Sequence, residues 1–237
     1  MPMFHTIFYV PLYNALIFLT HVFGGSLGLA VIGLTIIVKL VLAPLAHASI
    51  KSQIEQKKLQ PLVDELKKKY PDQKEQTAKL MELYKEHKTN PFAGCLLLIL
   101  QLPVIVALYR VFMSGAAINP AELYSFVTAP VSLATQFIGL DLAAAHNIIL
   151  AILAGLSQFL QMYWSPAMQP SAQPSSGGDA PADMAATMQK SMKYTMPVMI
   201  AVFAYAVPGA VALYWIVSNI TMIIQERIVM KTMNGTT

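Results

Sequence analysis

Long stretches without any charged side chain are the feature that most restricts what this chain can fold into. Asp, Glu, Lys and Arg are all absent from residues 1–38, 91–109, 142–178 and 194–225. A helix needs about 20 apolar residues to cross the roughly 30 Å hydrocarbon core of a bilayer. Only 12% of the 237 residues are charged, which is half the usual share of a soluble domain. The expected class is therefore an all-α integral membrane protein, and a soluble enzyme does not fit.

Five membrane-spanning helices are expected from these stretches. The last stretch holds two of them, because a single helix over 194–225 would be about 48 Å long and Pro208-Gly209 interrupts it. The expected spans cover residues 27–46, 92–112, 147–164, 193–207 and 210–226. Together they form a five-helix core.

Residues 1–26 are apolar enough to cross a membrane, but polar residues and a proline interrupt them, among them His5, Pro11 and Asn14. They also lack the basic region that begins a signal peptide. We expect an interfacial helix on the extracytoplasmic side. A sixth span with its N-terminus inside the cell is the alternative.

The distribution of Lys and Arg sets the expected orientation. Residues 47–91 contain ten lysines, whereas residues 113–146 contain no Lys or Arg. By the positive-inside rule the first segment is cytoplasmic and the second is an extracytoplasmic loop. Residues 165–192 then form a flexible cytoplasmic loop and 227–237 a short cytoplasmic tail. The net charge of +4 follows from this topology, so binding to DNA is not favoured.

The charged block 47–91 has apolar residues at helical spacing on either side of Pro71-Asp72. This pattern predicts a cytoplasmic helical hairpin with a thin apolar stripe. We consider two interpretations, a mobile docking element and a solvated charged loop that needs no partner.

Polar side chains inside the expected spans mark a candidate site. Lys39 lies roughly 10 Å from the cytoplasmic end of its helix, and Thr35 is one turn away on the same face. The other spans contribute Gln101, Ser157, Gln158, Gln161, Ser218 and Asn219. All lie towards the cytoplasmic ends of their helices, which predicts a hydrated pocket open to the cytoplasm and closed towards the outside.

Lys39 is the central member of this site. We identify no acidic residue at a matching depth, so its charge favours an anionic partner from outside the chain. In the alternative interpretation Lys39 snorkels to the interface and the amides pair between helices. A channel would need polar residues along its whole length, which this distribution does not provide.

Signatures of catalysis are missing. The phosphate-binding pattern GxxxxGK[ST] is not present, and the five histidines lie outside the spans or at their ends. Ser157 and Ser218 have no base nearby in sequence, and the single cysteine, Cys95, permits no disulfide within the chain. We therefore expect no catalytic residue, no cofactor and no metal.

Several long motifs resemble the YidC/Oxa/Alb family of membrane protein insertases, in the family's order. They are GLAVIGLTIIVKLVLAPL, LQPLVDELKKKYPD with LMELYKEHKTNPFAGC, QLPVIVALYRVF, and MKYTMPVMIAVFAYAVPGAVALYWIVSNITMIIQ. The resemblance covers roughly residues 4–230. It implies five core helices around a hydrophilic groove that opens to the cytoplasm and to lipid. We expect a short form, which departs from the family in having no large extracytoplasmic domain.

The resemblance also implies a function and site residues. The groove's basic residue falls on Lys39, where the family usually has Arg, and Thr35, Gln101, Tyr214 and Trp215 fall on groove or substrate-contact positions. The implied activity is insertion of nascent membrane proteins into the bilayer of the bacterial plasma membrane without nucleotide hydrolysis. A Sec translocon and a ribosome are further implied partners, although the short C-terminal tail argues against tight ribosome binding. A small transporter or ion pathway that uses Lys39 is the alternative.

Overall fold

The computed structural model describes residues 2–87, 89, 93–113, 118–130, 132–165 and 180–234. These residues are mostly helical, which confirms the predicted all-α class. The elements are, in order, α1 (Pro2–Phe4), η1 (His5–Tyr9), α2 (Val10–Val22), α3 (Leu27–Val41), α4 (Ala43–Lys58), α5 (Gln60–Lys69), α6 (Gln73–Glu86), α7 (Ala93–Met113), η2 (Pro120–Glu122), β1 (Gln136–Phe137), β2 (Leu140–Asp141), α8 (Ile148–Trp164), α9 (Ala180–Ala206) and α10 (Gly209–Asn234).

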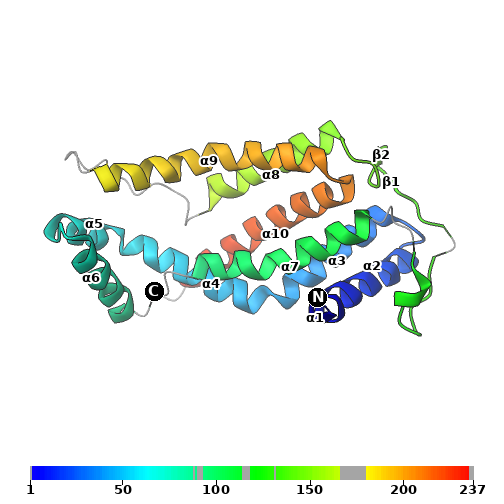
Figure 1. Ribbon diagram of the computed structural model, residues 1–237, viewed down its shortest axis with the longest axis horizontal. Helices are drawn as coiled ribbons and strands as arrows, with labels where there is room; N and C mark the ends of the chain where they lie inside the picture. Colours follow the sequence, from blue (N-terminus) through cyan, green and yellow to red (C-terminus); the bar gives the residue numbers. More distant parts are fainter. Residues whose placement is uncertain are drawn as a thin grey trace.

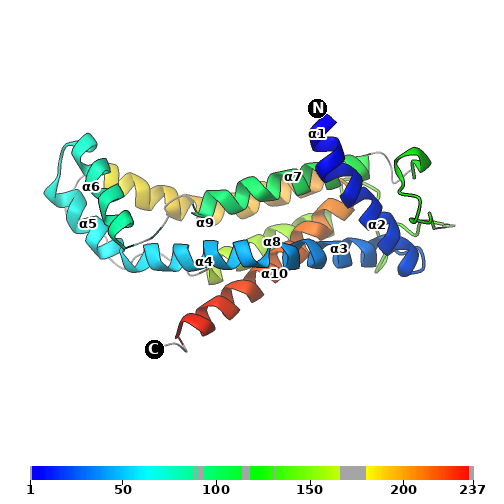
Figure 2. The same ribbon diagram turned by 90° about the horizontal axis from the view of Figure 1, so that it is seen from below.

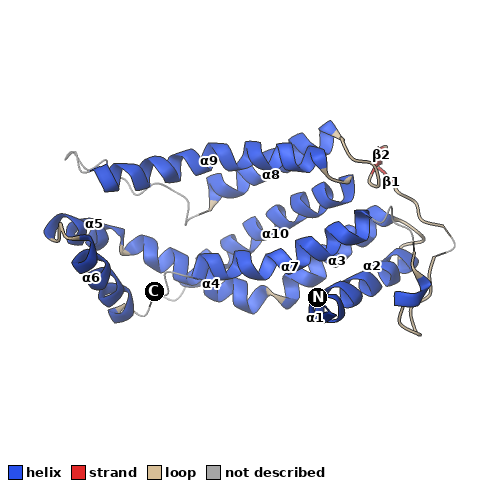
Figure 3. Cartoon of the chain, in the orientation of Figure 1, coloured by secondary structure: helices blue, strands red, loops and turns tan. Residues whose placement is uncertain are grey.

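Helix α10 is the element that joins the others. It packs against α3, α4 and α7, and also against α8 and α9. Figure 1 shows it running between these two groups, and Figure 3 shows how little of the chain is strand. The buried core lies where these helices meet and includes Leu34, Leu108, Ala154 and Tyr214. Polar side chains of α10 can therefore reach both groups of helices.

The segment predicted as one span over 27–46 is two helices. Helix α3 ends at Val41 and α4 begins at Ala43, with an angle of 65° between them. Pro44 occupies the first turn of α4, where its missing N–H leaves no hydrogen bond unmade. Among the described residues no single helix is long and apolar enough to qualify as a membrane span, and this bent pair meets both criteria together.

The charged block folds into a helical hairpin that α4 extends. Helices α5 and α6 pack on each other, and both lie at the end of the molecule opposite the β-hairpin (Figures 1 and 2). The Asp72 carboxylate caps α6 by accepting a hydrogen bond of 3.1 Å from the N–H of Glu75. Leu59 and Val63 are buried, but most of the hairpin's side chains are exposed or half-buried.

Helices α8 and α9 pack closely because a glycine lies between them. A Cβ atom at Gly155 would lie 2.9 Å from the Cβ of Ala201 and 3.0 Å from the carbonyl oxygen of Pro197. The flexible loop predicted over 165–192 is wrong in its later part, since α9 already begins at Ala180. Residues 166–179 of that prediction lie outside the described residues.

The predicted break at Pro208-Gly209 separates α9 from α10. The N–H groups of Gly209 and Ala210 donate to the carbonyl oxygens of Ala144 and Leu142, at 3.0 and 2.9 Å. These bonds satisfy two of the donors that the start of a helix leaves free. The loop before α8 thus fixes the beginning of α10. Helix α10 then runs past the predicted span end at residue 226, so most of the predicted tail is helical.

Candidate functional site

Lys39 lies in the last turn of α3, just before the bend into α4. Its half-buried ammonium group donates to the side-chain oxygen of Gln101 on α7, with an Nζ–Oε1 distance of 3.4 Å. Its backbone carbonyl accepts a hydrogen bond of 3.3 Å from the amide of Gln225 on α10. Carbonyls in the last turn of a helix have no partner within that helix, which explains why this one is open to Gln225. Three helices therefore meet at Lys39.

No carboxylate of the described residues lies within 4 Å of the Lys39 ammonium. The ion pairs that these residues form are His5 with Glu122, Lys51 with Glu55, and Lys79 with Glu82. The amide nitrogen of Gln101 and the amide oxygen of Gln225 are also buried without a partner in this part of the chain. Lys39 is thus surrounded by polar groups whose hydrogen-bonding capacity is only partly used.

Thr35 lies one turn before Lys39 and is 1% exposed. Its hydroxyl donates to the carbonyl of Val31 in the same helix at 2.6 Å. This local bond satisfies the hydroxyl proton, as is common for Thr inside a helix. The structure therefore places Thr35 beside the site but turns its hydroxyl to the backbone.

A second polar group joins α8 to α10. The indole N–H of Trp215 donates to the side-chain oxygen of Gln158 at 3.0 Å. One turn further along α10, the amide of Asn219 donates to the hydroxyl of Ser157, the residue before Gln158 on α8, also at 3.0 Å. The Ser157 hydroxyl in turn donates to the carbonyl of Ala154. Four of the predicted site residues are thus paired across one helix interface.

Gln161 extends this second group to a residue that the sequence reasoning overlooked. Its amide nitrogen donates to Oε1 of Glu226 at 3.3 Å, and the hydroxyl of Ser165 donates to the same oxygen at 2.8 Å. Glu226 is only 3% exposed. Glu226 is thus a buried acidic residue at the end of the span expected over 210–226, and it was not among the predicted site residues. An uncharged run that ends at a single Glu before Arg227 was the available signal.

The remaining predicted residues, Tyr214 and Ser218, lie one turn apart on α10 and are buried. Tyr214 is part of the hydrophobic core, and its hydroxyl has no hydrogen-bond partner among the described residues. The predicted set is therefore arranged in two groups, one around Lys39 and Gln101 and the other between α8 and α10. Helix α10 contacts both through neighbouring residues, Gln225 and Glu226.

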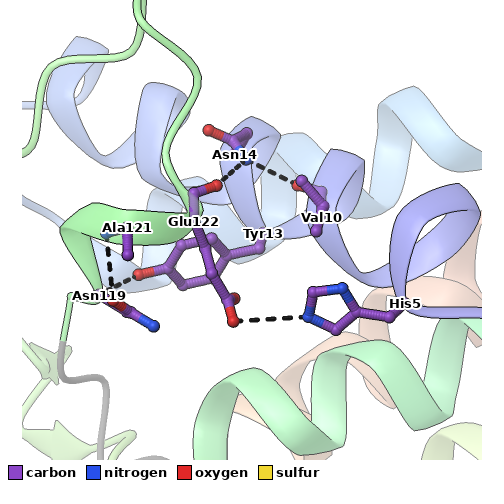
Figure 4. A network of polar contacts seen from close by, with 7 residues as sticks. All are labelled: His5, Val10, Tyr13, Asn14, Asn119, Ala121 and Glu122. Carbon is purple, nitrogen blue, oxygen red and sulfur yellow. Dashed lines mark hydrogen bonds and ion pairs between the residues drawn. The ribbon is translucent and has the colours of Figure 1, made fainter. Parts of the chain in front are cut away.

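A separate polar network ties the N-terminal helix to the loop after α7 (Figure 4). The Asn14 side chain donates to the carbonyl of Glu122 at 2.8 Å and accepts from the N–H of Tyr124 at 2.7 Å. The Tyr13 hydroxyl accepts from the N–H of Asn119 at 2.7 Å. These side chains replace backbone partners that the loop lacks, so this network anchors the loop.

An ion-pair contact closes the same network. Nε2 of His5 lies 3.4 Å from a carboxylate oxygen of Glu122, as Figure 4 shows. The His5 ring also stacks on Tyr9, and Tyr9 on Tyr13. In the described part of the chain no three His, Cys, Asp or Glu residues are grouped as metal ligands would be.

Comparisons with known proteins agree on one family. The family described as "60Kd inner membrane protein" matches residues 18–236. The "Membrane protein insertase YidC" of Fusobacterium nucleatum is 35% identical over 214 residues, which are 90% of this chain and 90% of that protein. The protein of the same name from Haemophilus ducreyi is 35% identical over 225 residues, or 94% of this chain. The chain spans only 37% of that second relative's length.

A solved structure has the same fold. It is described as "Active YidC insertase crystal structure with the first transmembrane domain resolved" and matches with a TM-score of 0.62 at 24% identity. The match covers 93% of this chain and 45% of that one. The family match over most of the chain and the 35% identity to a relative of similar length agree with the predicted resemblance. This chain therefore belongs to the 60Kd inner membrane protein family, whose members matched here include insertases of the YidC type.

Proposed function

We propose that this chain inserts membrane proteins into the lipid bilayer, and that Lys39 receives acidic residues in the part of the substrate that is translocated. The names of its relatives support the activity. The role proposed for Lys39 rests on one observation. A half-buried ammonium is held by a single long hydrogen bond, with no carboxylate of the described residues near enough to neutralise it.

The cost of that arrangement supports a functional role. A lysine at the centre of a membrane helix costs about 2.5–3.5 kcal/mol on insertion scales. Ionisable residues inside membrane spans mark substrate or ion paths by default. Lys39 reduces the cost of bringing a negatively charged tail to this depth, because the two opposite charges attract strongly where water is scarce.

Neighbouring polar groups would assist the uncharged part of the tail. The unpartnered amide nitrogen of Gln101 can donate to a substrate carbonyl, and the amide oxygen of Gln225 can accept from an N–H. These groups and the α8–α10 side chains form the proposed hydrophilic groove. The apolar segment of the substrate then leaves the groove for lipid, gaining roughly 25 cal/mol for each Å² of apolar surface removed from water. No covalent step or nucleotide is needed.

The proposed topology follows the charge distribution. The five segments 27–46, 92–112, 147–164, 193–207 and 210–226 cross the membrane, the first of them as the bent pair of α3 and the start of α4. The lysine-rich hairpin and the C-terminus lie in the cytoplasm. Residues 113–146 are extracytoplasmic. In this orientation Lys39 lies towards the cytoplasmic side, where a nascent chain arrives. Lipid and nascent membrane proteins are the proposed partners, and a Sec translocon or a ribosome would be auxiliary.

Insertion into sealed vesicles tests this function. The purified protein is reconstituted without nucleotide and mixed with a single-span substrate that has an acidic tail, and tail translocation is read by protease protection. The expected result is protection well above that of protein-free vesicles, without leakage of an encapsulated dye. Protection equal to that of empty vesicles would exclude the proposal, and flux of a small solute in its place would favour the transporter alternative.

A further inference from the structure

We infer that Glu226 is a positioning residue, which orients the Trp215 indole through a chain of two glutamine side chains. This inference rests on the proposed function only in giving Trp215 a substrate to contact. This chain of hydrogen bonds runs from the cytoplasmic end of α10 to α8 and back to α10. Its links are Trp215 to Gln158 at 3.0 Å, Gln158 to Gln161 at 3.4 Å, and Gln161 to Glu226 at 3.3 Å.

The two ends of the chain determine the direction of every link. The indole N–H of Trp215 can only donate, and Oε1 of Glu226 accepts from both Gln161 and Ser165. Gln161 must therefore turn its NH₂ group to Glu226, which leaves its oxygen facing Gln158. Gln158 in turn directs its NH₂ to Gln161 and its oxygen to Trp215. An amide can otherwise be placed either way round, so a fixed acceptor at Glu226 removes that ambiguity.

The burial of Glu226 makes this order of hydrogen bonds difficult to change. Glu226 is 3% exposed, and it receives a second hydrogen bond of 2.8 Å from Ser165. A buried carboxylate with two donors on one oxygen cannot turn away without leaving both donors unpaired. Its second oxygen is buried and has no partner among the described residues, so no described hydrogen bond from that oxygen pulls the carboxyl group away from Gln161 and Ser165.

At the other end of the series of hydrogen bonds, the surroundings of Trp215 limit how its ring can turn. Its ring is half-buried and meets the edge of Phe203 on α9, with centroids 5.9 Å apart and an interplanar angle of 61°. The hydrogen bond to Gln158 fixes the remaining rotation of the indole. If Gln158 presented its NH₂ group, two donors would face each other and the ring would have to turn. Glu226 thus sets the surface that Trp215 offers to a substrate.

Fluorescence of Trp215 tests this inference without any substrate. The protein has two tryptophans, so Trp164→Phe leaves Trp215 as the only one. In this background Gln158→Leu breaks the last link directly and sets the full size of the emission shift. Glu226→Leu should produce most of that shift although it lies two residues further along the hydrogen-bond chain. Glu226→Gln keeps an acceptor oxygen but can also turn its NH₂ group to Gln161, so it should produce a smaller shift than Glu226→Leu.

Ser165→Ala is the matched control, because it removes a hydrogen bond to the same oxygen of Glu226 without breaking the series of hydrogen bonds that leads to Trp215. It should leave the emission unchanged. Gln161→Met interrupts the chain while keeping both ends, so it replaces Glu226→Leu if that variant cannot be purified. An unchanged Trp215 signal in Glu226→Leu, or in Gln161→Met, would overturn the inference. A shift in Ser165→Ala as large as in Glu226→Leu would also overturn it, since general loosening of α8 would then explain both.

The insertion assay separates this inference from the proposed function. If both hold, Glu226→Leu shifts the emission and slows insertion, and Glu226→Gln does both to a smaller extent. A shift in emission with no insertion even by the unmodified chain would leave the chain of hydrogen bonds intact and reject the function. Normal insertion by Glu226→Leu despite a shifted emission would reject the positioning role of Glu226.

Discussion

Replacing Lys39 by Met removes the positive charge but keeps most of the side-chain volume, so it isolates electrostatic reception of the substrate. Two opposite charges 4 Å apart attract by about 4 kcal/mol at an effective dielectric constant of about 20. The substrate must displace Gln101, and at 3.4 Å that bond contributes only about 1 kcal/mol. Ordering and partial desolvation of both charges cost a further 1–2 kcal/mol or so. About 1–2 kcal/mol remains for an acidic tail residue.

A difference of this size corresponds to roughly a 5- to 30-fold change in rate. Lys39→Met should therefore slow insertion of a substrate with one acidic tail residue by that factor. Insertion of a matched substrate with Asn or Gln in its place should change much less. Lys39→Arg should retain activity because the charge remains, and Lys39→Glu should be the slowest because it repels the tail.

The assay compares initial rates of tail protection in vesicles for the two substrates. Lys51→Met is the matched control, since it removes a lysine from the exposed side of α4, where Lys51 is 4.0 Å from Glu55. It should leave both rates unchanged. An equal loss for both substrates in Lys39→Met would refute electrostatic reception and assign Lys39 to groove hydration or folding.

Three further predictions concern the rest of the molecule. After replacement of Cys95, a cysteine at Ser132 should react with an impermeant reagent from outside and one at Met81, which is 47% exposed, should not; the opposite pattern would invert the topology. Amides of α5 and α6 should exchange with deuterium much faster than those of α8, because so few of their side chains are buried; equal protection would mean that the hairpin is a rigid domain. Asn14→Ala removes both side-chain bonds to the loop and should destabilise the protein by about 2–3 kcal/mol. Asn119→Ala loses only a local bond to Ala121 and should cost less than about 1 kcal/mol; similar thermal unfolding of these two variants would argue against the anchoring role.

Depth in the predicted spans placed together some residues whose side chains the structure brings into contact. Lys39 and Gln101 were assigned to the cytoplasmic ends of neighbouring spans, and the structure places their side chains in contact. The same reasoning grouped Ser157 with Asn219, which hydrogen-bond across the α8–α10 interface. Such pairs can be predicted because polar side chains at the same depth in an apolar environment hydrogen-bond to one another between helices.

Glu226 was missed for a physical reason. Its position just before Arg227 is typical of a solvated tail, and its burial depends on Ser165 and Gln161 from another helix. The angle and register between α8 and α10 decide that contact, and neither follows from the composition of one segment. The hydrogen bond from Gln225 to the Lys39 carbonyl could not be predicted for the same reason, because it depends on how α10 packs against α3.

Two errors in the helix boundaries have local causes. The bend between α3 and α4 coincides with Pro44, a signal that the continuous apolar run concealed. The segment 165–192 was assigned as a loop from its many Pro, Ser and Gly residues. These are concentrated before Ala180, whereas the following residues are rich in Ala and Met, which favour helices. Division of that segment by composition would have placed the start of α9 more accurately.

Crosslinking from a stalled nascent chain tests the central claim most directly. A photoreactive residue is placed in the middle of the substrate's acidic tail, and the adducts formed with the reconstituted protein are mapped to single residues. The proposed path predicts adducts around Lys39, Gln101 and Trp215, which weaken when Lys39 is replaced by Glu. Adducts confined to the exposed apolar face of α8 and α9, at residues such as Ile152 and Val198, would show that the tail passes along the outer surface and would contradict the account.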